Sequence, residues 1–185
     1  QDALNQLRTG RVRDAVNAYL GHDRVDVHPT PESMIHAAVD RWFAARDTGG
    51  RPVLLAGTND LVDRLNDAVL ARLRHVGEIL QPAGSQFAVG ERIVLRQNTH
   101  LPTPAGDVVK VANGQTGTIT AIDKEGLAVR LGGTGDVVLP TDYVSAAVSH
   151  AYALTVHRAQ GGTWDHAIVV GAEGLYREGA YVALP

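Results

Sequence analysis

The sequence AYALTVHRAQGGTWDHAIVV, residues 151–170, decides how the rest of the chain is interpreted. An apolar lead-in is followed by four polar side chains, those of Thr155, His157, Arg158 and Gln160. Two glycines come next, and residues 167–170 then predict a short buried strand. Such donors, next to backbone N–H groups without side chains, can converge on the oxygens of a phosphate. On residue chemistry alone, the segment is either an anion-binding turn or a polar turn between two core segments.

Residues 155–161, with Asp165 and His166 after them, resemble the fifth conserved motif of superfamily-one DNA helicases. The likeness points to the RecD-type (exonuclease V alpha-subunit) branch and to the helicase halves of conjugative relaxases. In that family the Thr and His of the motif contact the phosphates of single-stranded DNA. The resemblance therefore implies a DNA-binding set that consists of Thr155, His157 and Arg158. It also implies a nucleotide-binding set on the turn, made of Gln160, Gly161, Gly162 and Thr163.

Composition sets the outer limits of the interpretation. The chain has 185 residues, 44% of them hydrophobic, which is enough for one sizeable domain with or without a small insertion. The formal net charge is −3, so no global basic field indicates a nucleic-acid partner. There is no cysteine, the eight histidines show no metal-ligand spacing, and no apolar run approaches the roughly 20 residues of a membrane span. We expect a soluble cytoplasmic protein without a metal site.

The first part of the chain predicts helices around short strands. Residues 1–20 have a broken helical pattern, residues 24–28 alternate as a strand would, and the abrupt start suggests a piece of a longer protein. Thr30 and Pro31 form a helix start. In the helix that follows, Trp42 and Phe43 are expected in the core rather than stacked on bases.

Residues 53–56 form a continuously apolar run, as in a strand buried on both faces of a parallel sheet. Thr58 and Asn59 follow it and precede a long amphipathic helix. They either only cap that helix or also face a ligand at the corner of an α/β sheet. Residues 54–65 resemble the strand–turn–helix that opens the second RecA-like domain of these helicases, which implies that Thr58 and Asn59 bind DNA.

Residues 86–148 contain short strands at close spacing, which predict a small β-barrel or curled sheet. Residues 101–106 read as an irregular loop and residues 132–135 as a hairpin turn. The helicase resemblance implies an SH3-like barrel here that helps to hold single-stranded DNA. Residues 113–119 also resemble the glycine-centred loop of KOW-type nucleic-acid-binding barrels.

The predicted fold is α/β: a RecA-like parallel sheet of the P-loop NTPase type, formed by residues 1–85 and 149–185, with an inserted SH3-like β-barrel at 86–148. The chain has no Gly-x-x-x-x-Gly-Lys-[Ser/Thr] and no Asp-Glu pair after an apolar strand, so it lacks a phosphate-binding loop and the Mg²⁺-holding acid. In the family both lie in a preceding RecA-like domain. Residues 180–184 resemble the lead into the sixth helicase motif, and the chain ends before that motif's arginine.

The resemblance thus implies a C-terminal motor-domain fragment of an ATP-dependent DNA helicase. The intact enzyme would use ATP and Mg²⁺, and its partners would be single-stranded DNA and the preceding RecA-like domain of the same polypeptide. The fragment alone is expected to be inactive as an ATP hydrolase and to contain no catalytic residue. One alternative is a non-catalytic nucleic-acid-binding module built on the KOW/SH3-like barrel. Another is a protein-interaction domain with an SH3-like peptide site, for which Phe87 and Tyr143 are the aromatics near the insert.

Overall fold

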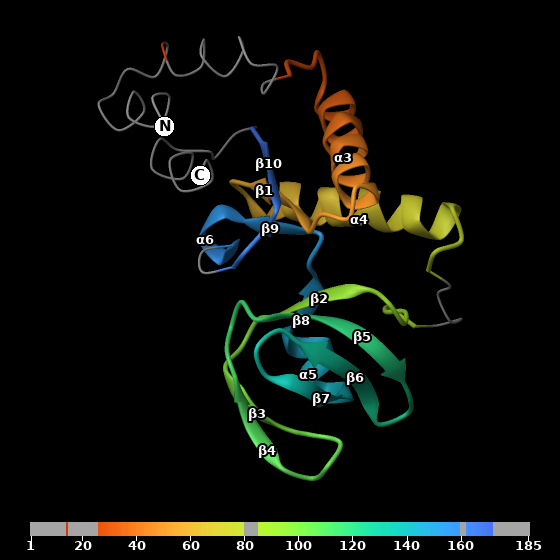
Figure 1. Cartoon of the computed structure of the whole chain (residues 1–185), viewed down its shortest axis with the longest axis vertical. Coiled ribbons are helices and arrows are strands. Elements are labelled where there is room, and N and C mark those ends of the chain that lie inside the picture. Colours follow the sequence, from red (N-terminus) through yellow and green to blue (C-terminus); the bar gives the residue numbers. More distant parts are fainter. Residues whose placement is uncertain (1–13, 15–25, 80–84, 160–161, 172–185) are drawn as a thin grey trace. The chain divides into compact units, whose positions relative to one another are not determined.

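The computed structural model describes Asp14 and residues 26–79, 85–159 and 162–171 (Figure 1). The chain divides into two compact units. The first comprises Gln1–Ala68 and Ala153–Pro185, and the second comprises Val69–Tyr152. Helix α4, Asn59–His75, begins in the first unit and ends in the second. The second unit therefore includes the last part of this helix as well as the segment that the sequence marks as an insertion.

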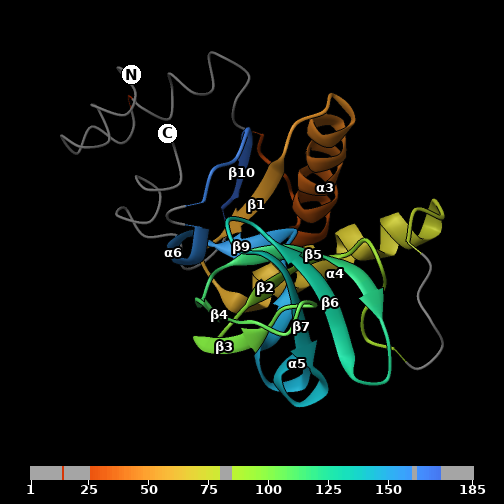
Figure 2. The same cartoon turned by 60° about the horizontal axis from the view of Figure 1, so that its bottom comes forward.

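The first unit is built on a parallel sheet of three strands in the order β10-β1-β9. These strands are β1 (Pro52–Ala56), β9 (Ala153–Thr155) and β10 (His166–Val170). All five residues of β1 are buried, and both of its neighbours run parallel to it. Figures 1 and 2 show the three strands side by side. The prediction of an α/β fold with a parallel sheet is confirmed, because the apolar run at residues 53–56 is the central strand.

Helix α3, Pro31–Asp47, begins where the sequence predicts it. The Thr30 hydroxyl accepts the Ser33 N–H at 3.1 Å, and the Ser33 hydroxyl accepts the Thr30 N–H at 3.3 Å, which completes a capping box. Trp42 and Phe43 are 2% and 5% exposed and meet edge to face with ring centroids 5.1 Å apart. Their predicted place in the core is confirmed. Among the described residues, no helix has the length and apolarity to cross a membrane.

The strand predicted at residues 24–28 is wrong for its described part. Asp26, Val27 and His28 form no strand, and Val27 is 85% exposed. Asp26 instead forms an exposed ion pair with Arg41 of α3 at 2.5 Å. The alternating pattern misleads here because neither face of the segment is buried. The helical pattern expected at residues 1–20 lies outside the described residues, apart from Asp14, which is helical.

The second unit contains an antiparallel sheet in the order β7-β6-β5-β2-β8 and a separate two-stranded sheet, β3-β4. The large sheet consists of β2 (Arg92–Leu95), β5 (Thr116–Ile122), β6 (Gly126–Leu131), β7 (Gly135–Pro140) and β8 (Val148–His150). The small sheet consists of β3 (Thr99–Pro102) and β4 (Val108–Val111), and α5 (Thr141–Ala147) follows β7. Figure 2 shows how β5, β6 and β7 curve.

Two details of the predicted insertion need correction. The predicted barrel does not close in the part of the chain that the structure describes, because β3 and β4 pair only with each other and the large sheet ends at β7 and β8. Residues 101–106 are not all loop, since Leu101 pairs with Val109 and Pro102 with Val108 across a hairpin. Two prolines near the turn suggested a loop, but Pro102 is the last residue of its strand, where the missing N–H costs little.

A buried carboxylate, Glu91, organises the start of β2. Its side chain is 0% exposed and accepts the Ala88 N–H at 3.1 Å. It also lies 3.2 Å from the Arg74 guanidinium and 2.9 Å from His150 Nε2. Burial by itself raises the pKa of the Glu91 carboxyl. Four interactions lower it: the hydrogen bond with His150, the Ala88 N–H, the charge of His150 and the hydrogen bond from Arg74. Together they outweigh burial, so the pKa is below its ordinary value. Glu91 thus joins the end of α4 to β8 within this unit.

Candidate nucleic-acid interface

The two polar motifs of the sequence lie at the same edge of the parallel sheet. In the strand register, Ala56 at the end of β1 pairs with Thr155 at the end of β9 and with Val170 at the end of β10. The turn before α4 follows β1 directly, and the short helix α6, Val156–Ala159, follows β9 (Figure 1). Carboxyl ends of parallel strands are the usual ligand-binding edge of an open α/β sheet. The fold therefore brings together segments that are about a hundred residues apart in the sequence.

At the first of these segments, Thr58 and Asn59 differ in their surroundings. The Thr58 hydroxyl accepts the N–H of Leu61 at 3.3 Å, and its carbonyl accepts the N–H of Val62 at 3.1 Å, so Thr58 caps α4. Asn59 is the first residue of the helix and its side chain is exposed. The capping interpretation thus accounts for Thr58, whereas the Asn59 amide is left facing solvent at the carboxyl edge.

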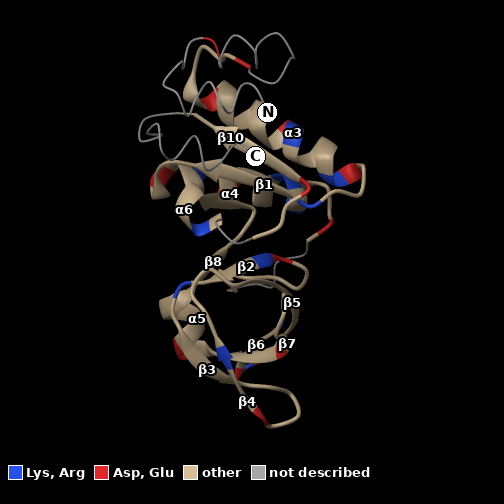
Figure 3. Ribbon diagram, turned by 60° about the vertical axis from the view of Figure 1, so that its left-hand side comes forward, with Lys and Arg blue, Asp and Glu red and all other residues tan. Residues whose placement is uncertain are grey.

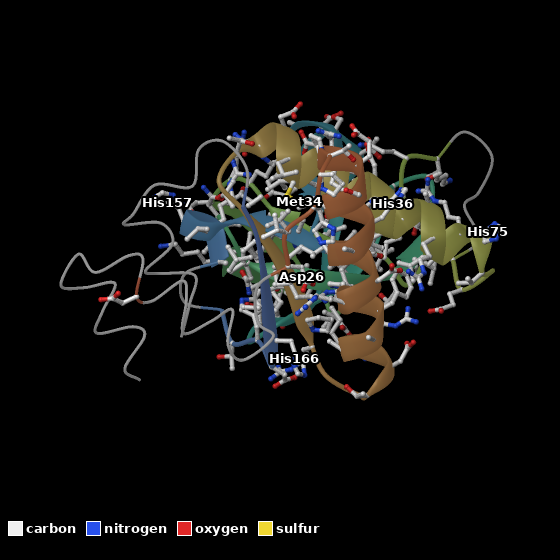
Figure 4. All side chains as sticks on the ribbon, turned by 90° about the horizontal axis from the view of Figure 1, so that it is seen from above. Asp26, Met34, His36, His75, His157 and His166 are labelled. Atoms are coloured by element: carbon white, nitrogen blue, oxygen red, sulfur yellow. The ribbon has the colours of Figure 1, made fainter. Side chains whose placement is uncertain are left out.

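At the second segment, Thr155 and Arg158 are half-buried and His157 is exposed. His157 projects from α6 away from the neighbouring strands (Figure 4), so it is not a core histidine. In the described part of the chain, neither His157 nor Arg158 takes part in an ion pair. Figure 3 shows a basic segment on α6 and no acidic one. The edge thus carries an imidazole and a guanidinium whose donors are available to an anion.

The residues after the motif lie at the amino ends of β1 and β10. The Gly162 N–H donates to the Ala159 carbonyl at 3.1 Å, and a Cβ on Gly162 would lie 2.7 Å from the indole Nε1 of Trp164. Asp165 accepts the Arg51 N–H at 2.8 Å and the Arg51 Nε–H at 3.2 Å. The hydrogen bonds from the Arg51 side chain and backbone hold the pKa of the exposed Asp165 carboxyl below its usual range. Asp165 therefore fixes the entry into β10 rather than facing the ligand edge.

The predicted nucleotide-binding set is only partly described. Gln160 and Gly161 lie outside the described residues, and Gly162 and Thr163 are both exposed. Tyr152, next to the motif, is 2% exposed, and its hydroxyl accepts the Arg92 N–H at 3.3 Å. Tyr152 is therefore a packed residue and is not exposed for stacking on a base. No group of three or more metal-ligating side chains converges anywhere in the described ranges.

One residue at this site, Asn66, is not predicted from the sequence. Asn66 lies in α4, is 5% exposed, and bonds to both backbone polar groups of Ala153 in β9. Its amide nitrogen donates to the Ala153 carbonyl at 3.3 Å, and its amide oxygen accepts the Ala153 N–H at 2.9 Å. A signal was present, because Asn66 is a polar residue on the apolar stripe of the helix, between Leu65 and Val69.

Comparison with known proteins finds one similar sequence and several similar structures. No family model matches the chain. Over 193 residues it is 23% identical to the "Probable conjugal transfer protein TraA" of Sinorhizobium fredii (strain NBRC 101917 / NGR234), and the match covers 99% of this chain and 17% of TraA. The structure is similar to Pif1 helicase from Bacteroides in a complex with ADP-AlF3 and ssDNA, with a TM-score of 0.61, 15% identity, and coverage of 99% of this chain and 45% of that one.

A second solved structure, Pif1 helicase from Candida albicans, matches with a TM-score of 0.55 and 18% identity over 99% of this chain and 49% of that one. These likenesses show the fold. The chain folds like part of a Pif1 helicase. It spans less than half of the Pif1 chains and 17% of TraA. A third solved structure, Bacteroides Pif1 bound to ssDNA, matches with a TM-score of 0.59 and 16% identity over 99% of this chain and 45% of that one.

Proposed function

We propose that this chain is the second RecA-like domain of an ATP-dependent superfamily-one DNA helicase of the RecD-type or relaxase-associated branch. Its role in the intact enzyme is to grip single-stranded DNA and to form one wall of the ATP cleft. The DNA contacts are assigned to Thr155, His157, Arg158, Thr58 and Asn59. The second unit, in this proposal, is a partly open, SH3-like insertion that helps to hold the strand. Likeness in fold to ssDNA-bound Pif1 helicases and in sequence to a conjugal transfer protein supports the assignment.

The observation that carries the proposal is the meeting of the two polar segments at the carboxyl edge. The register that pairs Ala56 with Thr155 places the Asn59 corner and α6 on one side of the sheet. The described residues there include an exposed imidazole and an unpaired guanidinium, in a chain whose net charge is −3. The imidazole and guanidinium donors of α6 suit a backbone phosphate even where the whole chain is not basic, and Asp60 in the first turn of α4 adds one exposed carboxylate beside Asn59.

The ATP side of the proposal rests on fewer residues. Because the sequence has no phosphate-binding loop, ATP and Mg²⁺ are assigned to the preceding RecA-like domain of the same polypeptide. This chain would add Gln160, Gly161, Gly162 and Thr163 at the nucleotide. Gly162 and Thr163 are exposed, so the Thr163 hydroxyl is accessible to a ligand, whereas the Gly162 N–H already donates to the Ala159 carbonyl at 3.1 Å. The chain alone is expected to hydrolyse no ATP.

Binding of a fluorescein-labelled oligodeoxythymidine by the 185-residue chain, followed by anisotropy, tests the DNA assignment. The T155A/H157A double variant is expected to bind about tenfold more weakly, because it loses two phosphate contacts worth about 0.7 kcal/mol each. R158A is expected to lower the slope of log K against log salt by about 0.7, the value for one phosphate contact on a single strand.

A matched control is His36→Ala, which removes an exposed imidazole from α3, away from α6 (Figure 4). H36A is expected to bind as the unaltered chain does. Equal binding by the unaltered chain and T155A/H157A, at the same salt and with both folded, would rule out the assignment of Thr155 and His157.

A second candidate function is nucleic-acid binding by the second unit without a motor. Its support is the β3-β4 hairpin, where His100 and Lys110 are opposite each other in register and both exposed. The KOW-like loop gives it less support, because the Gln115 amide is used inside the unit, at 3.0 Å from the Gly132 carbonyl and 2.5 Å from the Thr134 hydroxyl. Under this alternative, H100A/K110A abolishes oligonucleotide binding while T155A/H157A leaves it unchanged.

A further inference from the structure

Strand β9 has no second strand partner among the described residues. It is the edge of the sheet β10-β1-β9 and pairs with β1 alone. In a parallel sheet, alternate residues direct their N–H and C=O groups to opposite neighbours. The Ala153 backbone groups face away from β1 and meet the Asn66 amide instead, at 2.9 Å and 3.3 Å. One side chain of α4 thus takes the place that a further strand would occupy.

Burial makes these two bonds necessary. Ala153 is 0% exposed and Asn66 is 5% exposed, so water cannot replace either partner. A buried N–H or C=O without a partner is strongly disfavoured. Asparagine suits the position because its side chain is an amide, with one donor and one acceptor, like the peptide unit it replaces. The hydrogen bonds therefore depend on the orientation of the amide and not only on the size of the side chain.

The anchored residue is close to the proposed DNA contacts. Thr155 is two residues beyond Ala153 on the same short strand, and His157 follows in α6. The anchoring helix is α4, which begins at Asn59, the other proposed contact. Asn66 is about two helical turns from that start, on a rigid element. A single amide thus ties the strand that carries one polar segment to the helix that carries the other.

We infer that Asn66 is a positioning residue: it anchors the outer side of β9 so that Thr155 and His157 are held ready for the phosphates of a single strand. The inference rests on the proposed function, because the positioned residues are the proposed DNA contacts. The positioning itself is argued from the Asn66–Ala153 hydrogen bonds. Asn66 itself does not touch the DNA. Without it, β9 keeps one hydrogen-bonded neighbour, and the segment after it samples positions that do not match the phosphate spacing.

The test uses Asn66→Asp and Asn66→Leu in the full 185-residue chain, with binding of labelled oligodeoxythymidine measured from pH 8 to pH 5. An ionised carboxylate at this position accepts the Ala153 N–H but repels the Ala153 carbonyl. A protonated carboxyl group donates to that carbonyl, as the amide does. Burial raises the pKa of an introduced carboxyl. N66D is therefore expected to bind about tenfold more weakly than the unaltered chain at pH 8, a loss of about 1.4 kcal/mol.

As the pH falls to 5, the ratio of N66D affinity to that of the unaltered chain is expected to return toward one. N66L, which has no titratable group, is expected to remain about tenfold weaker at every pH. Ala71→Asp, which adds a carboxylate to an exposed position of α4, is the matched control and is expected to show no such trend. Residues that only stabilise the fold would not give a pH-dependent recovery in a chain that is already folded by circular dichroism.

Two outcomes separate the inference from the proposed function. If the unaltered chain binds and folded N66D and N66L bind equally well, or N66D shows no recovery at low pH, the positioning role is overturned. If the unaltered chain binds no oligonucleotide, the proposed function fails, and hydrogen exchange at the Ala153 amide then decides the anchor alone. Faster exchange of that amide in N66L, which has no acceptor for the Ala153 N–H, supports the anchor, and unchanged exchange in folded N66L overturns it. N66D at pH 5 serves as the folded comparison where N66L does not fold.

Discussion

Replacing Glu91 by glutamine removes a charge at the centre of the second unit while keeping the size of the side chain. The carboxylate is fully buried and is approached by Arg74 at 3.2 Å, His150 at 2.9 Å and the Ala88 N–H at 3.1 Å. The amide of the E91Q variant accepts with one oxygen only, so at least one of these donors loses its partner. The NH2 group of the amide is then placed against a second donor.

The expected loss follows from the exposure of the partners. Each charge-assisted hydrogen bond is worth about 1.5–3 kcal/mol, so the two side-chain bonds to the carboxylate give an upper figure of about 3–6 kcal/mol. The Arg74 side chain is 33% exposed and can regain water, whereas that of His150 is 14% exposed. Discounting the Arg74 bond for solvent leaves a destabilisation of about 2–4 kcal/mol. For a domain of this size that lowers Tm by about 10–20 °C.

Hydrogen exchange in β2 and β8, measured at increasing urea, reports this loss in the second unit. Both tryptophans, Trp42 and Trp164, belong to the first unit, so tryptophan fluorescence separately monitors the other half of the chain. Glu125→Gln, at an exposed turn position, is the matched control and is expected to change stability by less than about 0.5 kcal/mol. A loss below about 1 kcal/mol in E91Q would refute the view that this carboxylate holds the unit together.

Three further predictions concern acid stability, a buried tyrosine and two glycines. The pKa of Glu91 is lower in the folded than in the unfolded state. The stability that Glu91 contributes is therefore complete above its unfolded pKa, near 4.5, and is lost as the pH falls through the lower folded pKa. Acid unfolding of the second unit is expected to lack this pH-dependent component in E91Q. Tyr152→Phe leaves the Arg92 N–H without its 3.3 Å acceptor, and the free energy of urea unfolding is expected to fall by about 1 kcal/mol. Burial raises the pKa of Tyr152 to about 12, so the absorbance of this tyrosine is expected to titrate only in strong alkali. Gly126→Ala is expected to lower the free energy of unfolding by more than about 3 kcal/mol, since Gly126 has φ 149° and a Cβ would overlap the Leu139 carbonyl oxygen. Gly133 has φ 76° and open space around it, so Gly133→Ala is expected to lower it by about 1 kcal/mol.

The fold of the first unit was predictable wherever local pattern and burial agree. Residues 53–56 are apolar on both faces because β1 is the central strand of a parallel sheet. Thr30 and Pro31 predict the start of α3 because capping is a local interaction. The strand predicted at residues 24–28 fails in its described part because alternation there reflects no buried face, with Val27 exposed.

The second unit was less predictable because its elements are short and depend on distant partners. Helix α5 was not foreseen, since its seven residues have no side-chain cap at Pro140 and little helical periodicity. The sequence predicts a loop at residues 101–106 because prolines hide the pairing of β3 with β4. Glu91 gives no signal at all in the sequence, because its burial depends on Arg74 and His150, which are far from it along the chain.

The candidate site was predictable as a list of residues but not as a geometry. Residues 155–161 and Thr58–Asn59 stand out by chemistry, yet only the register of β1 and β9 shows that they share an edge. Asp165 belongs to the stretch that resembles the helicase motif, but it is held by Arg51 just before β1, five residues before Ala56, and so lies away from the carboxyl ends of the strands. Asn66 stands out as a polar residue on the apolar stripe of α4, but the sequence does not show which backbone groups its amide satisfies.

Mapping the DNA footprint by hydrogen exchange is the most direct test of the claim that single-stranded DNA lies on the carboxyl edge of the parallel sheet. The 185-residue chain would be exchanged with and without a saturating oligodeoxythymidine at low salt. The account predicts slower exchange in peptides covering residues 54–62 and 151–159, and no change in residues 99–111. Protection confined to residues 99–111, with exchange at the sheet edge unaltered, would contradict it and favour the β3-β4 hairpin as the binding surface.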